Sequence, residues 1–126
     1  MTKQKVTGIG GLFFRAENPE KLAQWYHDHL GVDPLPGDYE TLPWQQQAGT
    51  TVFAPFAADT DYFGRDAQKW MINFRVHDLD AMCVQLEDAG ITVVLDRETY
   101  PNGRFARIHD PEDNPVELWE PAEPAI

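Results

Sequence analysis

The chemistry in this sequence centres on a carboxylate near its end, in the stretch DPEDNPVELWEP at residues 110–121. In a strand, Val116 and Leu118 point to one face of the sheet. Glu117 and Trp119 then point to the other face. A glutamate beside a tryptophan can ligate a metal, contact a bound molecule, act as a general base, or simply be a solvated strand residue.

Few other side chains could join such a site. His27 and His29 lie two residues apart on an expected helix, so they face different directions and favour a solvated helix end. His77 precedes a helix cap and His109 precedes the Asp-Pro turn, which places both near the surface. The single cysteine, Cys83, falls on an apolar helical stripe, where a packed thiol is favoured over a reactive one.

Composition narrows the classes of function. The 126 residues suit one domain, and 42% hydrophobic with 25% charged residues is ordinary for a soluble globular protein. The net charge of −11 disfavours nucleic acid and anionic membranes as partners, because both are polyanions. No apolar run approaches the roughly 18 residues that span a bilayer, and no secretory leader is visible. We therefore expect a cytoplasmic protein; its surface charge says little about a small-molecule ligand.

Two helices are strongly marked by their end signals. The first, over 19–30, follows an Asn-Pro pair and stops at a glycine. The second, over 79–89, opens at Asp78 and stops at Gly90. These two helices are the elements around which the strands must be arranged.

The helices belong to a repeated βαβββ pattern, which predicts a duplicated module. The modules span approximately 6–56 and 70–121 of a single domain, 1–126, and the polar segment 57–69 links them. The expected strands are 9–15, 32–35, 42–47 and 50–55 in the first module, and 70–76, 91–95, 104–109 and 115–120 in the second.

This pattern resembles the vicinal oxygen chelate superfamily, the group of glyoxalases, bleomycin-resistance proteins and extradiol dioxygenases. The resembling segments are GIGGLFFRAENPEKLAQWYHDHLG (8–31), INFRVHDLDAMCVQLEDAGITV (72–93) and GRFARIHDPEDNPVELWEP (103–121). The last is the most specific, because it joins a strand, an Asp-Pro-x-x-Asn turn and a strand carrying Val-Glu-Leu. The resemblance implies an α+β fold in which two βαβββ modules form a cupped mixed sheet with the helices on its outer face.

With the helices outside, residue parity predicts which side chains enter the cup. Those expected beneath the helices include Leu12, Phe14, Ile72, Phe74 and Val76. The aromatic and polar side chains expected inside, a mixture typical of a small-molecule pocket, are Phe13, Arg15, Phe53, Asn73, Arg75, Phe105, Arg107, Glu117 and Trp119, of which Phe53 is placed there by the resemblance and not by parity.

Metal-dependent members of the superfamily hold their ion at four related points. The matching positions here are Gly11, Phe53, Met71 and Glu117. Glycine and phenylalanine offer no donor atom, and a thioether is too soft for the divalent ions of this family. A catalytic metal usually has about three protein ligands, so we expect no cofactor, with a divalent ion through Glu117 left open.

Two functions from different classes remain open. The favoured one resembles the antibiotic-sequestering members: a small organic molecule binds in a largely metal-free cavity, stacked on aromatic rings and oriented by Glu117 and arginines. The alternative is a glyoxalase-like lyase or isomerase, in which Glu117 is the general base and an arginine stabilises the oxyanion. Inward arginines favour an anionic or carbonyl-bearing ligand, whereas the acidic surface favours a cationic one. The resemblance also implies a homodimer, and a third interpretation is a domain that serves mainly for dimer formation.

Overall fold

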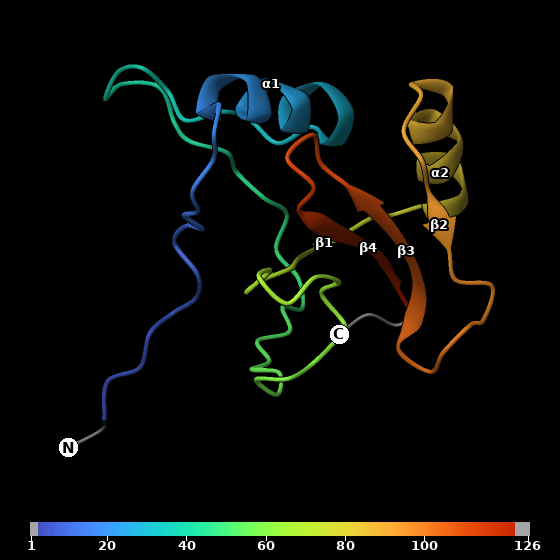
Figure 1. Cartoon of the computed structure of the whole chain (residues 1–126). Coiled ribbons are helices and arrows are strands. Elements are labelled where there is room, and N and C mark those ends of the chain that lie inside the picture. The colour runs from blue at the N-terminus through green and yellow to red at the C-terminus, as the bar shows by residue number, and fades with distance from the viewer. Residues whose placement is uncertain (1–2, 123–126) are drawn as a thin grey trace.

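Two helices and four strands form the regular structure (Figure 1). The computed structural model describes residues 3–122. In chain order the elements are α1 (Pro19–Leu30), β1 (Ile72–Arg75), α2 (Leu79–Asp88), β2 (Val94–Leu95), β3 (Gly103–His109) and β4 (Pro115–Pro121). Within the described residues, no helix has the length and apolar character needed to cross a membrane. The α+β class predicted from the sequence is confirmed.

Both helices begin and end within one residue of the predicted bounds. The side chain of Asn18 accepts a hydrogen bond from the backbone N–H of Lys21 at 3.2 Å. Gly31 closes α1 in the left-handed conformation. Asp78 caps α2 in the same manner as Asn18 caps α1, by accepting from the N–H of Ala81 at 3.0 Å.

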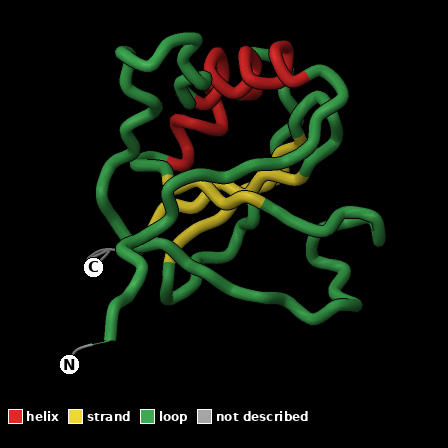
Figure 2. The backbone as a smooth tube through the Cα atoms, turned by 90° about the vertical axis from the view of Figure 1, so that its left-hand side faces the viewer, coloured by secondary structure: helices red, strands yellow, loops and turns green. Residues whose placement is uncertain are grey.

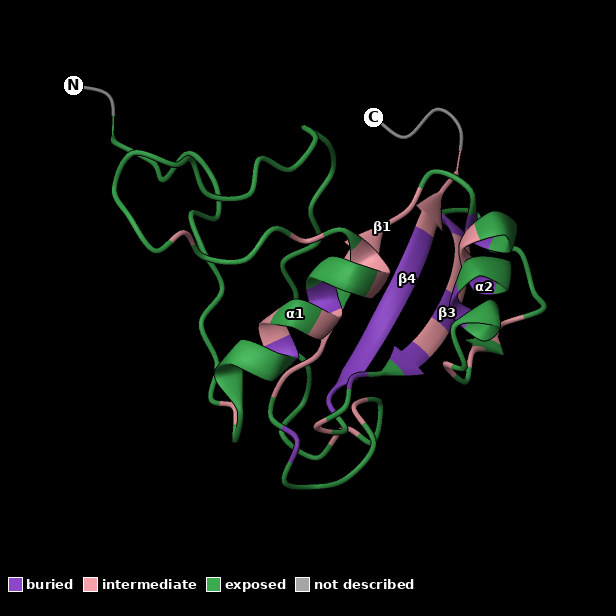
Figure 3. Ribbon diagram, turned by 90° about the horizontal axis from the view of Figure 1, so that it is seen from above, coloured by how far each residue is buried: buried purple, intermediate pink, exposed green. Residues whose placement is uncertain are grey.

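The four strands form one mixed sheet in the order β1-β4-β3-β2. β1 lies parallel to β4, and the other pairs are antiparallel. The register sets Glu117 of β4 between Asn73 of β1 and Arg107 of β3. Because β4 is an interior strand, its residues from Pro115 to Trp119 are all buried (Figure 3).

Both helices cover the same face of the sheet, and the hydrophobic core lies between them and the strands (Figure 2). Ile72, Phe74 and Val76 pack against this core as parity predicts, and Cys83 is a buried thiol. Each fully buried leucine or valine contributes about 1.5–3 kcal/mol. The buried core residues are Leu22, Tyr26, Leu79, Cys83, Leu86, Ala106, Ile108, Val116 and Leu118.

The turn between β3 and β4 attaches α1 to the sheet. The buried carboxylate of Asp110 accepts a hydrogen bond from the hydroxyl of Tyr26 at 2.6 Å. The carboxylate of Glu112 accepts from the backbone N–H groups of Glu17 and Asn18 at 2.7 and 3.0 Å. A negative charge at the start of a helix is favourable, so this turn fixes both the position and the direction of α1.

The first half of the chain differs from the prediction. The second half forms the expected βαβββ module, but no strand forms within residues 3–71. Pro34, Pro36 and Pro43 cannot donate to a ladder, which disfavours interior strands around them. The expected strands that are replaced by irregular or extended chain are 9–15, 32–35, 42–47 and 50–55.

These unpaired segments leave large apolar side chains in solvent (Figure 3). Leu12, predicted to lie beneath α1, is instead 51% exposed, because no sheet holds its segment against the helix. Phe14 rests on Trp70 with ring centroids 4.7 Å apart, yet remains 39% exposed. Other exposed apolar residues of this half are Val6, Ile9, Phe13, Leu35, Leu42, Val52 and Phe53. Such an accumulation is typical of an interaction surface.

The Tyr26–Asp110 contact predicts the effect of Tyr26→Phe, which removes the hydroxyl and keeps the ring. We expect the free energy of unfolding to fall by about 1.5–3 kcal/mol, the contribution of a hydrogen bond to a charged group. Burial and the Asp110 carboxylate raise the pKa of Tyr26 above its ordinary value of 10.0. The contribution is therefore complete below about pH 10 and is lost as the pH rises further.

Denaturant unfolding of both proteins between about pH 7 and pH 11 measures this difference. Tyr39→Phe is the matched control, because the side chain of Tyr39 is fully exposed. Equal stability of Tyr26→Phe and wild type at neutral pH would contradict the assigned role of this hydrogen bond.

Candidate functional site

The face of the sheet opposite the core gathers most of the predicted site residues. On β3 and β4, alternation turns Ala106 and Leu118 into the core and the intervening residues away from it. The same alternation operates on β1. We call this surface the open face; the predicted residues that it carries are Asn73, Arg75, Phe105, Arg107, Glu117 and Trp119.

Glu117 is the buried acid at the centre of the open face, with 8% of its surface exposed. One carboxylate oxygen accepts a hydrogen bond from the side-chain amide of Asn73 at 2.7 Å, and the other accepts from the hydroxyl of Tyr62. A buried carboxylate requires such partners. Burial and the neighbouring carboxylate raise the pKa of Tyr62, so its phenol is a protonated donor at neutral pH.

Arg107 completes this cluster by holding Tyr62. Its Nη1 donates to the backbone carbonyl of Tyr62 at 2.7 Å, and its Nη2 lies 3.2 Å from the sulfur of Met71. The guanidinium carbon is 4.7 Å from the centre of the Tyr62 ring, within cation–π range. Tyr62 is therefore held through its hydroxyl, its ring and its carbonyl.

Phe105 and Trp119 form an aromatic wall on the same face. Their rings are stacked at an angle of 3°, with centroids 6.2 Å apart. The indole N–H of Trp119 donates to the carbonyl of Asn102 at 2.8 Å, which fixes the plane of the ring. Gly103 lies beside the indole with φ +131°, a conformation that favours glycine.

Sequence reasoning missed Tyr62, which it assigned to a polar linker. The segment 56–64 folds into two turns, closed by the N–H groups of Thr60 and Gly64 at 3.0 Å each. Phe56 stacks on Tyr62 with centroids 5.6 Å apart. The one available signal was an adjacent Tyr-Phe pair inside an otherwise polar stretch.

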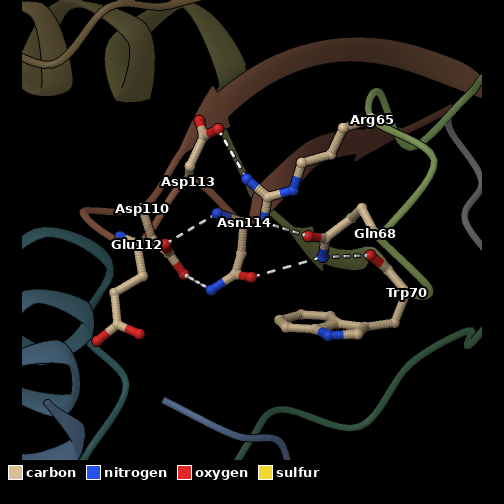
Figure 4. Close-up of polar contacts among 7 residues, drawn as sticks. All are labelled: Arg65, Gln68, Trp70, Asp110, Glu112, Asp113 and Asn114. Atoms are coloured by element: carbon tan, nitrogen blue, oxygen red, sulfur yellow. Dashed lines mark hydrogen bonds and ion pairs between the residues drawn. The ribbon is translucent and has the colours of Figure 1, made fainter. Parts of the chain in front are cut away.

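A network of hydrogen bonds joins the linker to the β3–β4 turn (Figure 4). Arg65 donates to Gln68 at 2.8 Å and forms an ion pair with Asp113 at 2.9 Å. Gln68 in turn donates to the carbonyl of Trp70 at 2.9 Å and lies 3.5 Å from the side chain of Asn114. The linker is thus anchored just after the segment that carries Tyr62.

The remaining predicted arginines lie outside the Glu117 cluster. Arg75 is on the open face, where it donates to the carbonyl of Gln47 at 2.9 Å. Arg15 is exposed and lines a shallow hollow of about 420 Å³ together with Arg65 and Glu112. A role for either arginine in binding stays a prediction.

The two aromatic residues predicted from the first half lie in solvent. Phe13 is 93% exposed and Phe53 is 84% exposed, both on segments without strand pairing. Their part in a binding site also stays a prediction.

The positions implied for a metal do not form a ligand set. Gly11 and Phe53 have no donor atom, and the sulfur of Met71 lies against the guanidinium of Arg107, whose charge opposes a cation there. Within residues 3–122, no group of three His, Cys, Asp or Glu side chains is placed to hold an ion. The residues present therefore do not fit the metal of this superfamily.

The chain belongs to the glyoxalase-like domain family, whose match covers residues 11–119. This membership confirms the vicinal oxygen chelate superfamily that the sequence indicated. No curated protein matches the chain significantly.

Three solved structures illustrate the proteins that share this fold. TnmS3, an antibiotic binding protein from Streptomyces sp. CB03234, is 24% identical with a TM-score of 0.64, covering 95% of this chain and 100% of that one. A glyoxalase/bleomycin resistance protein from the same organism is 25% identical with a TM-score of 0.50, covering 82% and 92%. A glyoxylase/bleomycin resistance protein/dioxygenase domain from Frankia sp. EAN1pec is 18% identical with a TM-score of 0.58, covering 93% and 99%.

Gly103→Ala tests the support of the aromatic wall. A β-carbon at this position would overlap the carbonyl oxygen of Glu120 and lie 2.8 Å from the indole nitrogen of Trp119. We expect a loss of about 1–3 kcal/mol in the free energy of unfolding, together with a change in tryptophan fluorescence. Gly10→Ala is the control, because a β-carbon there meets no atom within 4 Å. Equal effects of the two substitutions would show that Gly103 is dispensable.

Proposed function

We propose that this protein binds a small organic molecule on the open face, around Glu117, without a metal. The observation that carries the proposal is a buried, hydrogen-bonded carboxylate beside an arginine and a stacked aromatic wall. This combination of apolar walls with a few convergent polar groups is typical of small-molecule sites. The likeness to an antibiotic binding protein and to a bleomycin resistance protein supports the same class of function.

The polar groups of the site favour binding over proton abstraction. Proton abstraction needs, besides a base, a free donor that stabilises the developing oxyanion, whereas the two Nη atoms of Arg107 are directed to the carbonyl of Tyr62 and the sulfur of Met71. A lyase or isomerase reaction with Glu117 as base is therefore the less supported alternative. In the binding role, Glu117 accepts from a ligand donor and Arg107 provides positive charge beside it.

Glu117→Gln tests this proposal, because it keeps the shape of the side chain and removes its charge. Hits from a thermal-shift screen of antibiotics, aromatic metabolites and thiol adducts are titrated against wild type and variant by tryptophan fluorescence. We expect affinity to fall by ~10-fold or more, the usual effect of losing a hydrogen bond to a charged acceptor.

Glu87→Gln on α2 is the matched control and should bind as wild type does. Hits that bind both variants with wild-type affinity would remove Glu117 from the site. A screen in which a chemical turnover is found and abolished by Glu117→Gln would instead favour the enzymatic alternative.

We also propose a cytoplasmic homodimer. The support for the dimer is the apolar surface of the first half, where Ile9, Leu12 and Phe13 are each at least half exposed. β1 is also an edge strand of the sheet, and edge strands can pair with a strand of another chain. The cytoplasmic location is supported by the cysteine content, because the single Cys83 cannot form an internal disulfide.

Light scattering after size-exclusion chromatography tests the dimer. We expect a mass of twice the 14.4 kDa chain. Ile9→Ser should shift the protein towards the monomer because it removes apolar area from the surface. Val84→Ser, at a comparably exposed apolar residue of α2, should leave the mass unchanged. A mass of one chain at all concentrations would rule out the homodimer.

A further inference from the structure

The contacts of Tyr62 with the open face are those expected of a bound ligand. Its hydroxyl donates to Glu117, and its ring lies under the guanidinium of Arg107. The ring of Phe56 stacks on the ring of Tyr62 with centroids 5.6 Å apart. Aromatic stacking, a cation at the ring and one directed hydrogen bond are the usual means of recognising an aromatic molecule. A side chain of the protein therefore occupies the central position of the candidate site.

The two donors to Glu117 differ in how firmly they are held. Asn73 belongs to β1, which is paired with β4 in the sheet. Tyr62 belongs to a turn, and 42% of its surface is exposed. Of the two donors, Tyr62 is thus the one that can leave while the sheet stays intact.

The contacts that anchor the linker do not involve Tyr62. Arg65 and Gln68 anchor the residues that follow, through Asp113 and the carbonyl of Trp70. Gly64, between Tyr62 and this anchor, has φ +92°, a conformation open to glycine without strain. Releasing the ring from Glu117 and Arg107 leaves the anchoring network of Figure 4 unbroken.

We propose that Tyr62 is a built-in competitor for the site, and that the ligand is a flat aromatic molecule carrying a phenolic or enolic hydroxyl. The ligand displaces Tyr62, donates its hydroxyl to Glu117 and places its ring against Arg107. This inference rests on the proposed binding function and names the chemical class of its ligand.

The charges of the site select this class over others. Glu117 is an acceptor and repels a carboxylate or phosphate, so the ligand must present a donor to it. Arg107 repels a cationic ligand from the same position, which leaves a neutral donor. The cation beside the ring position favours an electron-rich aromatic face. A hydroxyl on an aromatic ring satisfies all three requirements, as the phenol of Tyr62 itself does.

Competition by Tyr62 has a measurable consequence. The apparent affinity of a ligand is its intrinsic affinity multiplied by the fraction of molecules whose site is open. Removing the competitor raises this fraction, so binding must become tighter. Tyr62→Ala removes ring and hydroxyl together, and Tyr62→Phe removes only the hydrogen bond to Glu117. Both changes are at a partly exposed turn residue, where folding is little affected.

Calorimetric titration with β-naphthol and its methyl ether tests the inference. The ether has the same ring and cannot donate. We expect wild type to bind β-naphthol more tightly than the ether, and Tyr62→Ala to bind β-naphthol ~10-fold more tightly than wild type, with Tyr62→Phe between them. Glu117→Gln should remove the preference for the hydroxyl.

Tyr39→Phe is the control, because it removes the same hydroxyl from a side chain that is fully exposed. It should bind both compounds as wild type does. Equal binding of the two compounds, or unchanged affinity in Tyr62→Ala, overturns the inference and leaves the proposed function standing. If neither compound binds any variant, the inference also falls. The proposed function is contradicted only if the hits of the wider screen also bind Glu117→Gln with wild-type affinity.

Discussion

The structure depends on the buried carboxylate of Asp110 at the turn between β3 and β4. It accepts hydrogen bonds from the hydroxyl of Tyr26, from the side chain and backbone N–H of Asn114, and from the N–H of Glu112. An unpartnered carboxylate in this position would be costly, so these groups are held together as a set. Through Tyr26 the set positions α1, and through Asn114 it reaches the linker. One buried side chain thus orients the helix, the hairpin and the segment that covers the site.

Strand β4 contributes both to the core and to the candidate site, because the side chains of successive residues point to opposite faces of the sheet. Val116 and Leu118 are fully buried in the core, while Glu117 and Trp119 shape the open face between them. A register shift of one residue would exchange the two sets and destroy both the core and the site. The strand that carries the most recognisable sequence is therefore also the one least free to change.

The sequence predicts the second half well and the first half poorly. Helix caps such as Asn18 and Asp78 act locally. The alternation of apolar and polar residues from Val116 to Trp119 allows only one choice of which side chains are buried in the core. A strand such as 9–15 needs a partner strand, and no local signal reveals whether the chain itself supplies one. Tyr62 was missed for a related reason: its place over Glu117 is set by distant contacts of the linker, which leave no periodic trace in the sequence.

The attachment of Tyr62 through side chains and one carbonyl has an evolutionary consequence. The 56–64 segment contributes no strand and no residue of the buried core, so substitutions in it cost little folding stability. Exchanging its aromatic residues would nevertheless alter which shape and which donor compete at Glu117. Under the proposed competition, selectivity for new compounds can therefore diversify through a short surface stretch, while the buried core beneath the carboxylate stays as it is.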